Sequence, residues 1–238
     1  MRGQLGPLFC EIPRLVRDYH HEMPRSPRAG GSSEEQREKY LLERLRNRDS
    51  AALGELFELH RQGLERIVRL RIDPRLAARV SPEDVLQETY LDAARQFHRY
   101  LENPGVSFHI WLRGLALERL FNLARDNLKA QRRAVGQEIR LPERSSALLC
   151  LQLGAAGTSP SQHLSRKELR ERVRLAVTRL EESDREVILM RHFENLSNGE
   201  VAEALGLTDS GATMRYGRAL CRLKEVWRRE FESEGSSR

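Results

Sequence analysis

The segment 183–227 constrains the fold of this chain most, because it marks its own helix starts. Ser197 and Glu200 match the capping-box pattern, in which a hydroxyl and a carboxylate satisfy free backbone amides in the first turn of a helix. Ser183 and Glu186 match the same pattern. The sequence therefore predicts two helices that begin close together along the chain.

A helix end and a third helix start follow in the same segment. Gly206 stands after a helical run, where a residue in the left-handed conformation commonly ends a helix. Thr208 can cap the next helix, because its hydroxyl accepts a hydrogen bond from an amide of the first turn. A short helix, a tight turn and a longer helix together make a helix-turn-helix.

The longer helix is predicted to have one packing side and one basic flank. Its apolar residues recur at three- and four-residue steps, which is the spacing of a buried helix face. Such a helix can enter a major groove, with side chains near its start at base edges and arginines at phosphates. The alternative is a plain helical hairpin whose arginines are only solvated. The flank consists of Arg215, Arg218, Arg222 and Arg229.

The text LSNGEVAEALGLTDSGATMRYGRAL resembles the helix-turn-helix of region 4 in bacterial sigma factors, and it is also similar to the DNA-binding module of LuxR-type response regulators. In sigma factors this module reads the −35 promoter element as duplex DNA. The family often has a basic residue where Thr213 stands, so we expect an unusual or weak −35 preference. The resemblance implies a phosphate contact at Arg222 and groove contacts at Ser210, Gly211, Thr213, Met214, Arg215 and Arg218.

A second motif lies in the helix that Ser81 and Pro82 are predicted to start, with acids near the positive end of the helix dipole. Its text DVLQETYLDA resembles sigma region 2, where the corresponding helix binds the clamp helices of core RNA polymerase. The alternative is an ordinary solvated helix face. The resemblance implies core-polymerase contacts at Asp84, Gln87, Glu88, Thr89 and Asp92.

The next helix, which begins near Phe108, is similar to the sigma segment that opens the −10 element and holds its non-template bases. Capture of a single strand needs aromatic platforms and a cationic track. Phe108 and Trp111 fit a packed core better than a stacking surface. Leu117 and Glu118 replace the family's usual Arg-Asn, and the acid would repel phosphate. The cationic residues expected at −10 DNA are Arg113, Arg119, Arg125, Lys129, Arg132 and Arg133.

Composition excludes several other classes of protein. The net charge of +6 favours a polyanionic partner, and heavy use of Arg, Glu and Leu favours helices. No membrane span or signal peptide is recognisable, so the expected compartment is the cytoplasm. Cys10, Cys150 and Cys221 lack metal-ligand spacing and are expected to be reduced. We expect no cofactor, no metal and no catalysis, because no phosphate-binding glycine loop or activated nucleophile is recognisable.

The predicted fold is all-α, with two small helical domains joined by a flexible linker. We expect a basic tail at 1–33, a region 2-like domain at 34–133, a linker at 134–164, a region 4-like domain at 165–232 and a tail at 233–238.

Two local expectations concern the start of the chain and the linker. A first helix is predicted to begin with a capping box of Ser33 and Gln36, and a short apolar helix is expected at 147–153. The buried side of the first helix is predicted to hold Tyr40, Leu41 and Leu45.

The order of the two motifs distinguishes the two families, because a LuxR-type regulator would carry an α/β domain before its terminal module. The chain therefore resembles a sigma-70 family factor of the extracytoplasmic-function (ECF) type. Such a factor binds core RNA polymerase, directs it to −10 and −35 elements and helps to open promoter DNA, and the family admits an anti-sigma factor as a further partner. Two alternatives stay open: a helix-turn-helix regulator of another class, and a sigma-like protein that sequesters polymerase or a regulator.

Overall fold

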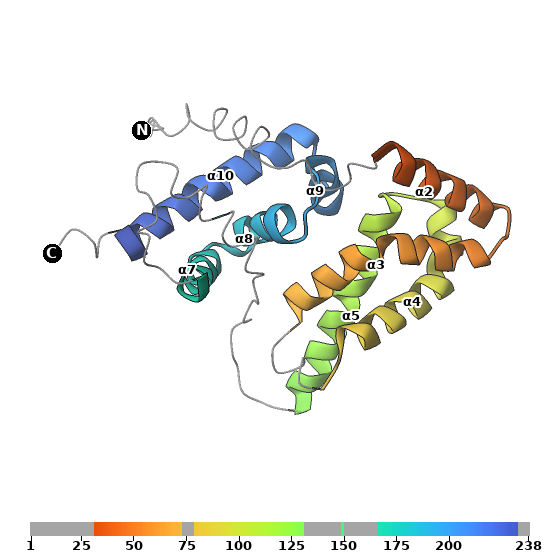
Figure 1. Cartoon of the computed structure of the whole chain (residues 1–238), viewed down its shortest axis with the longest axis horizontal. Helices are drawn as coiled ribbons and strands as arrows, with labels where there is room; N and C mark the ends of the chain where they lie inside the picture. Colours follow the sequence, from red (N-terminus) through yellow and green to blue (C-terminus); the bar gives the residue numbers. More distant parts are fainter. Residues whose placement is uncertain (1–30, 73–78, 131–148, 150–165, 233–238) are drawn as a thin grey trace. The chain divides into compact units, whose positions relative to one another are not determined.

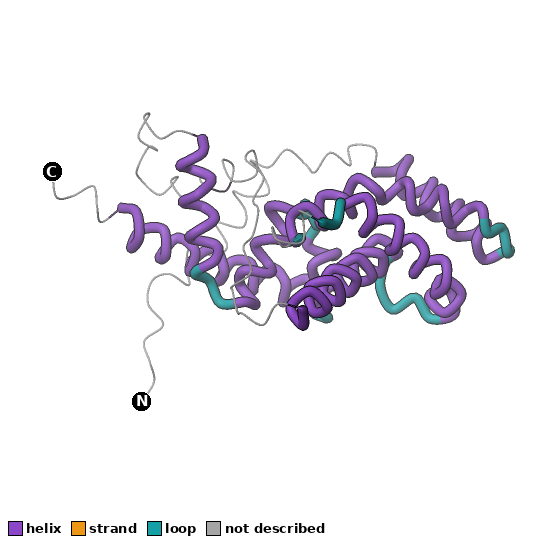
Figure 2. The backbone as a smooth tube through the Cα atoms, turned by 90° about the horizontal axis from the view of Figure 1, so that it is seen from below, coloured by secondary structure: helices purple, strands orange, loops and turns teal. Residues whose placement is uncertain are grey.

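The structure is a computed structural model that describes residues 31–72, 79–130, 149 and 166–232. Every regular element in these ranges is helical, and no strand occurs within them (Figure 2). The predicted all-α fold is confirmed. The chain divides into two compact units, which are described separately.

The first unit, Arg25–Arg140, is called the α2–α5 unit after its described helices. In this unit α3 packs against α2, α4 and α5, and α4 also packs against α5 (Figure 1). The core between these helices is apolar, and Leu56, Leu64, Leu86 and Leu112 have no exposed surface. The helices are α2 (Gly31–Arg46), α3 (Ala51–Arg71), α4 (Pro82–Glu102) and α5 (Phe108–Ala130).

The start of α4 follows from local sequence. Ser81 and Asp84 form a capping box, in which the Asp84 amide donates to Ser81 Oγ over 3.1 Å and the Ser81 amide donates to Asp84 Oδ2 over 2.9 Å. Pro82 occupies the first helical position, where no amide donor is needed. The predicted start at Ser81 is therefore confirmed.

The first helix differs from its prediction in two respects. Leu41 and Leu45 are buried as expected, but Tyr40 is 59% exposed, because α2 packs mainly against α3 and Tyr40 lies outside that contact. The Tyr40 ring instead lies 5.7 Å from the guanidinium carbon of Arg44. Ser33 is not a cap, because α2 already begins at Gly31.

The second unit is called the α7–α10 unit after its described helices, which lie within residues 166–232. Its helix α10 packs against α7, α8 and α9 (Figure 1). The core contains Val173, Ile188, Phe193, Ala219 and Leu223, none of which is exposed. The elements are α7 (Arg166–Thr178), α8 (Glu182–Ile188), the π-helical turn η2 (Leu189–Phe193), α9 (Asn198–Leu205), α10 (Asp209–Trp227) and the π-helical turn η3 (Arg228–Glu232).

One predicted helix start in this unit is wrong. The cap of α8 is Glu181, whose carbonyl accepts from the amides of Asp184 and Arg185, so Ser183 lies inside the first turn. The apolar helix expected at 147–153 lies outside the described residues except for Leu149, which is helical and buried. The predicted tail at 233–238, residues 1–30 of the predicted basic tail and all of the linker except Leu149 also lie outside them, whereas residues 31–33 of the predicted basic tail belong to α2.

Candidate DNA-binding and protein-binding faces

The turn between α9 and α10 is fixed by caps that the sequence predicts. The Glu200 amide donates to Ser197 Oγ over 3.2 Å, and the Ser197 amide donates to Glu200 Oε2 over 2.8 Å, which starts α9. Gly206 ends α9 with a φ of 62°, which is a left-handed conformation. Residues with a β-carbon adopt this conformation only at a cost in free energy. The Gly211 amide donates to Thr208 Oγ1 over 3.1 Å and starts α10. The helix-turn-helix is confirmed.

A side-chain bridge joins the starts of the two helices. Asn198 Nδ2 donates to the carbonyl of Asp209 over 2.9 Å. Thr213 Oγ1 donates to the same carbonyl over 2.9 Å and lies 3.3 Å from Asn198 Oδ1. Sequence analysis missed Asn198, whose only signal is its place directly after a helix cap. Because these bonds engage the Thr213 hydroxyl, this side chain holds α10 in place and is less available to a base edge than expected.

The other predicted groove residues divide by exposure. Ser210, Met214 and Arg218 are exposed and stand four residues apart, so they form one row along α10. Gly211 and Arg215 are half-buried beside this row. Arg218 Nε reaches back to the carbonyl of Met214 over 3.4 Å, a long bond that leaves the rest of its guanidinium at the surface. This row is the face of α10 best placed for a ligand.

Arg222 has a role that the sequence did not predict. Its guanidinium donates to the carboxylate of Asp184 on α8, which is buried. This hydrogen bond and the attraction of the carboxylate raise the pKa of Arg222 above its usual value. Arg222 therefore braces α8 against α10, because Asp184 would otherwise be buried without a partner. The Arg222 side chain is 54% exposed, so its expected phosphate contact stays a prediction.

A second polar cluster, in η2, holds the inner side of α10. His192 Nε2 lies 2.9 Å from Tyr216 Oη, and both side chains are buried. Burial, and then the charge of Arg191, lower the pKa of His192 to about 3, so the imidazole is neutral near pH 7. Arg191 Nη1 donates to the carbonyl of Leu196 over 2.6 Å, and its guanidinium lies 5.5 Å from the centre of the Tyr216 ring. The cluster connects the turn before α9 to the recognition helix.

On α4 the predicted polymerase contacts are not equally accessible. Gln87 and Asp84 are exposed, although the Asp84 carboxylate also serves the capping box, which lowers its pKa. Asp92 is half-buried and accepts from Arg95 over 3.0 Å. Thr89 is wrongly placed in this set, because it has no exposed surface and its hydroxyl donates to the carbonyl of Val85 over 2.7 Å, as helical threonines commonly do.

Glu88, the remaining contact predicted on α4, is engaged by α5. Arg119 Nη2 lies 2.8 Å from Glu88 Oε2, and both side chains are partly exposed. The pair joins a predicted polymerase contact to a predicted −10 contact. Sequence reasoning missed it, because the two residues lie on different helices.

The predicted −10 residues of α5 have different environments. Arg113 is only 5% exposed, so its predicted DNA contact is corrected to a place in the interior of the unit. Arg119 is partly exposed and Arg125 is exposed. Lys129 lies in α5, but its side chain is outside the description, and Arg132 and Arg133 lie outside the described residues. The accessible cations are therefore fewer than the sequence predicted.

The aromatic residues at the start of α5 belong to the core, as expected for Phe108 and Trp111. Phe108 is 1% exposed, and the ring of Trp111 stacks on Tyr100 with centroids 4.6 Å apart. His109 is also buried and stacks on His60 at 5.2 Å. None of these side chains forms an open stacking surface.

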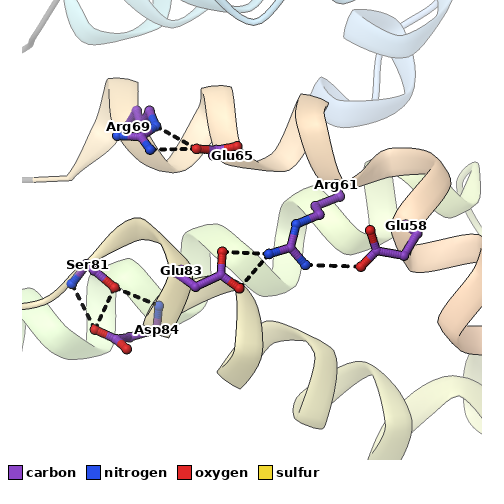
Figure 3. A network of polar contacts seen from close by, with 7 residues as sticks. All are labelled: Glu58, Arg61, Glu65, Arg69, Ser81, Glu83 and Asp84. Atoms are coloured by element: carbon purple, nitrogen blue, oxygen red, sulfur yellow. Dashed lines mark hydrogen bonds and ion pairs between the residues drawn. The ribbon is translucent and has the colours of Figure 1, made fainter.

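A groove lies between α3 and α4 in the α2–α5 unit, with a volume of about 480 Å³. Its edge is set by Arg61, whose Nη2 lies 2.5 Å and 2.6 Å from the two carboxylate oxygens of Glu83 and whose Nη1 donates to Glu58 over 3.0 Å (Figure 3). These hydrogen bonds raise the pKa of Arg61 above its usual value, and the hydrogen bond with Glu83 has the larger effect. The lining residues are Gly54, Phe57, Glu58, Arg61, Leu86, Gln87, Tyr90 and Leu91.

The described residues contain neither a membrane-spanning helix nor a cluster of metal-binding side chains. No helix in these ranges has an apolar stretch of the length needed to cross a bilayer. No group of three or more His, Cys, Asp or Glu side chains there is arranged to hold a metal ion.

Comparisons with known proteins support the helix-turn-helix motif and the helical fold. The family model "Sigma-70, region 4" matches residues 170–223. The RNA polymerase sigma factor YlaC of Bacillus subtilis (strain 168) is 24% identical over 152 residues, covering 64% of this chain and 80% of YlaC. The solved structure of CnrH in complex with the cytosolic domain of CnrY has a similar fold, with a TM-score of 0.50 and 23% identity, covering 82% of this chain and 99% of the matched chain. Residues 170–223 therefore match region 4 of the sigma-70 family, and over most of its length the chain is similar to an RNA polymerase sigma factor and to CnrH.

Proposed function

We propose that this chain is a sigma factor, which binds core RNA polymerase, directs it to promoters with −10 and −35 elements, and helps to open the DNA for initiation. The observation that supports this function best is the exposed row Ser210, Met214 and Arg218 on a recognition helix held by caps and by the Asn198 bridge. In this proposal polymerase supplies the chemistry, and the chain supplies recognition.

The −35 element is read by α10 as duplex DNA. Ser210 and Met214 lie near the start of the helix, where side chains reach base edges, and Arg218 lies one turn further along, where it meets phosphate. A hydroxyl and a thioether discriminate bases less sharply than a bidentate arginine on guanine. We therefore propose a modest −35 sequence preference, with much of the affinity coming from phosphate contacts.

Core polymerase is bound by the exposed face of α4, through Asp84, Gln87, Glu88 and Asp92. Three of these residues are carboxylates, so the face favours a partner with basic side chains. The melted −10 strand is held along α5, with Arg119 and Arg125 as the accessible cations among the side chains described.

A regulatory protein partner is a second proposal. The similar solved structure is that of CnrH in complex with the cytosolic domain of CnrY. We infer by analogy that an anti-sigma factor binds this chain and limits its access to polymerase.

Polymerase binding tests the central proposal. Fluorescently labelled protein titrated with purified core RNA polymerase is expected to bind, and Glu88→Arg is expected to weaken the affinity at least about tenfold, because it places a cation in an acidic interface. Glu102→Arg, at the exposed end of the same helix, is the matched control and should bind normally. Unchanged affinity for Glu88→Arg would contradict the assignment of this face.

A further inference from the structure

The middle of the exposed row on α10 is apolar. Met214 is 37% exposed, and it lies one turn after Ser210 and one turn before Arg218. Within α10, which the structure describes from end to end, Met214 is the one large hydrophobic side chain that is exposed. Its thioether is unbranched and adapts to an irregular surface. An apolar side chain at this place gains free energy when a ligand covers it.

The hydroxyl groups nearest to Met214 in the sequence are engaged within the protein. Ser210 Oγ lies 3.2 Å from Thr208 Oγ1, within hydrogen-bonding distance. Thr213 Oγ1 donates to the carbonyl of Asp209 over 2.9 Å. A hydroxyl that reads a base edge has to give up or share such a bond, which reduces what it adds to recognition. The start of α10 therefore offers a base less hydrogen bonding than its composition suggests.

The helix that carries Met214 is held on its inner side and at its start. Ala212 and Ala219 have no exposed surface, so the inner side of α10 packs closely in the core of the unit. At the start of the helix, Asn198 Nδ2 donates to the carbonyl of Asp209 over 2.9 Å. These contacts fix the place from which Met214 meets a bound duplex, which is what sequence discrimination requires.

The major groove of DNA presents one apolar feature at its base edges. All four base pairs show hydrogen-bond donors or acceptors there, but thymine alone among the four bases also carries a methyl group, at C5. A thioether has no donor for the acceptors of guanine or adenine, whereas it can cover a methyl group and remove it from water. An exposed methionine on a recognition helix therefore matches thymine best.

We propose that Met214 reads one thymine of the −35 element by packing its side chain against the 5-methyl group of that base. This inference rests on the proposed function, in which α10 enters the major groove, and it names the base feature that the helix reads. Arg218 supplies affinity for phosphate one turn further along, and Met214 supplies the preference for one base. The same contact accepts the methyl group of 5-methylcytosine, because this group lies at the same place in the groove.

Uracil tests the contact, because it pairs as thymine does and lacks only the 5-methyl group. A duplex library with a randomised core is selected on the full chain, alone and with purified core RNA polymerase. The selected duplex is then resynthesised with each thymine in turn replaced by uracil. At one position the affinity is expected to fall about fourfold, which corresponds to one methyl group returned to water. With cytosine at that position, methylation of its C5 should raise the affinity.

Three variants assign the contact to a side chain. Met214→Ala should bind the thymine and uracil duplexes equally, because it removes the apolar partner of the methyl group. Met214→Leu is the matched control, and it should keep the difference because leucine is apolar and similar in size. Thr213→Ser removes the methyl group of the neighbouring residue and should also keep the difference. Circular dichroism melting checks that each variant is folded, and Met214 is a surface residue whose substitution leaves the core intact.

The outcomes separate the thymine contact from the proposed function. Equal affinity of the parent chain for thymine and uracil at every position overturns the contact, and reading of DNA by α10 stands if Arg218→Ala still reduces the salt dependence. A difference that persists in Met214→Ala overturns the assignment to Met214, and its loss in Thr213→Ser alone moves the contact to Thr213. If the selection enriches no sequence, with or without polymerase, the contact and the reading of a −35 element by α10 are both contradicted.

Discussion

Arg119 of α5 lies 2.8 Å from the carboxylate of Glu88 on α4, which pairs a residue proposed to meet promoter DNA with one proposed to meet polymerase. The side chains are 32% and 42% exposed, so water screens the ion pair. Exposed pairs of this kind stabilise a fold by at most about 1 kcal/mol. Both residues are therefore available to partners at little cost in free energy.

The first prediction follows from this pair. Glu88→Gln and Arg119→Gln are each expected to lower the free energy of unfolding of the α2–α5 unit by less than about 1 kcal/mol, measured by urea denaturation. The double substitution should cost no more than the two single ones together. A loss of several kcal/mol would show that the pair holds the fold and that it is not free to exchange partners.

Arg218 and Arg222 stand one turn apart on α10 and are predicted to respond differently. Arg218→Ala should weaken binding to a −35 duplex by about 1 kcal/mol and reduce the dependence of affinity on salt, because it removes a phosphate contact. Arg222→Ala should instead destabilise the α7–α10 unit by about 1–3 kcal/mol, because the buried carboxylate of Asp184 loses its partner. Affinity measured across a salt series and thermal melting separate the two effects. Unchanged salt dependence in Arg218→Ala would contradict the docking of α10.

The buried His192 predicts how the stability of the α7–α10 unit depends on pH. Its pKa is about 3 in the folded chain, whereas an unperturbed imidazole has a pKa of 6.5, so between these limits the unfolded state binds a proton that the folded state does not. The contribution of His192 is complete above pH 6.5, and the free energy of unfolding should fall by up to about 1.4 kcal/mol per pH unit as the pH decreases from 6.5 towards 3.

A fluorescent probe isolates this effect. Trp227 is buried in α10, and in a Trp111→Phe background it is the one tryptophan, so its emission reports unfolding of this unit. His192→Gln should flatten the slope between pH 6.5 and 5, whereas His98→Gln, at an exposed position of α4, should leave it unchanged. If the free energy of unfolding falls as steeply with decreasing pH in His192→Gln as in His98→Gln, the role of His192 is contradicted.

Gly206 is expected to be the glycine most sensitive to substitution in the helix-turn-helix. Gly206→Ala should destabilise the α7–α10 unit by about 1 kcal/mol, because its φ of 62° is unfavourable for a residue with a β-carbon. Gly114→Ala is the matched control, since Gly114 lies inside α5 with open space around it, and it should be neutral or stabilising. Equal melting temperatures for Gly206→Ala and the parent would show that the turn tolerates strain.

Features set by neighbouring residues could be predicted from the sequence. The boxes at Ser81 and Ser197, the left-handed Gly206 and the Thr208 cap each involve residues within four positions of one another. Their hydrogen bonds form within one turn, so the pattern suffices. The all-α fold followed from the same signals.

Features set by packing between helices could not be predicted from the sequence in this way. Thr89 belongs to a motif of polar residues, but its turn of α4 faces the core, and Arg113 is buried although arginines are usually exposed. The partner of Arg222 lies 38 residues away on α8, beyond any local pattern. The groove beside Leu91 is lined by residues from both α3 and α4, which lie far apart in the sequence. These contacts decide which residues of each motif are accessible.

Transcription in vitro tests the central claim most directly. Purified core RNA polymerase is combined with genomic promoter fragments, with and without the chain, and the 5′ ends of the transcripts are mapped. The proposed function predicts start sites that depend on the chain and share −10 and −35 elements, and that weaken with Arg218→Ala and Glu88→Arg. If polymerase gives the same starts with and without the chain, although the chain binds duplex DNA, the proposed function is contradicted and the chain acts as another kind of regulator.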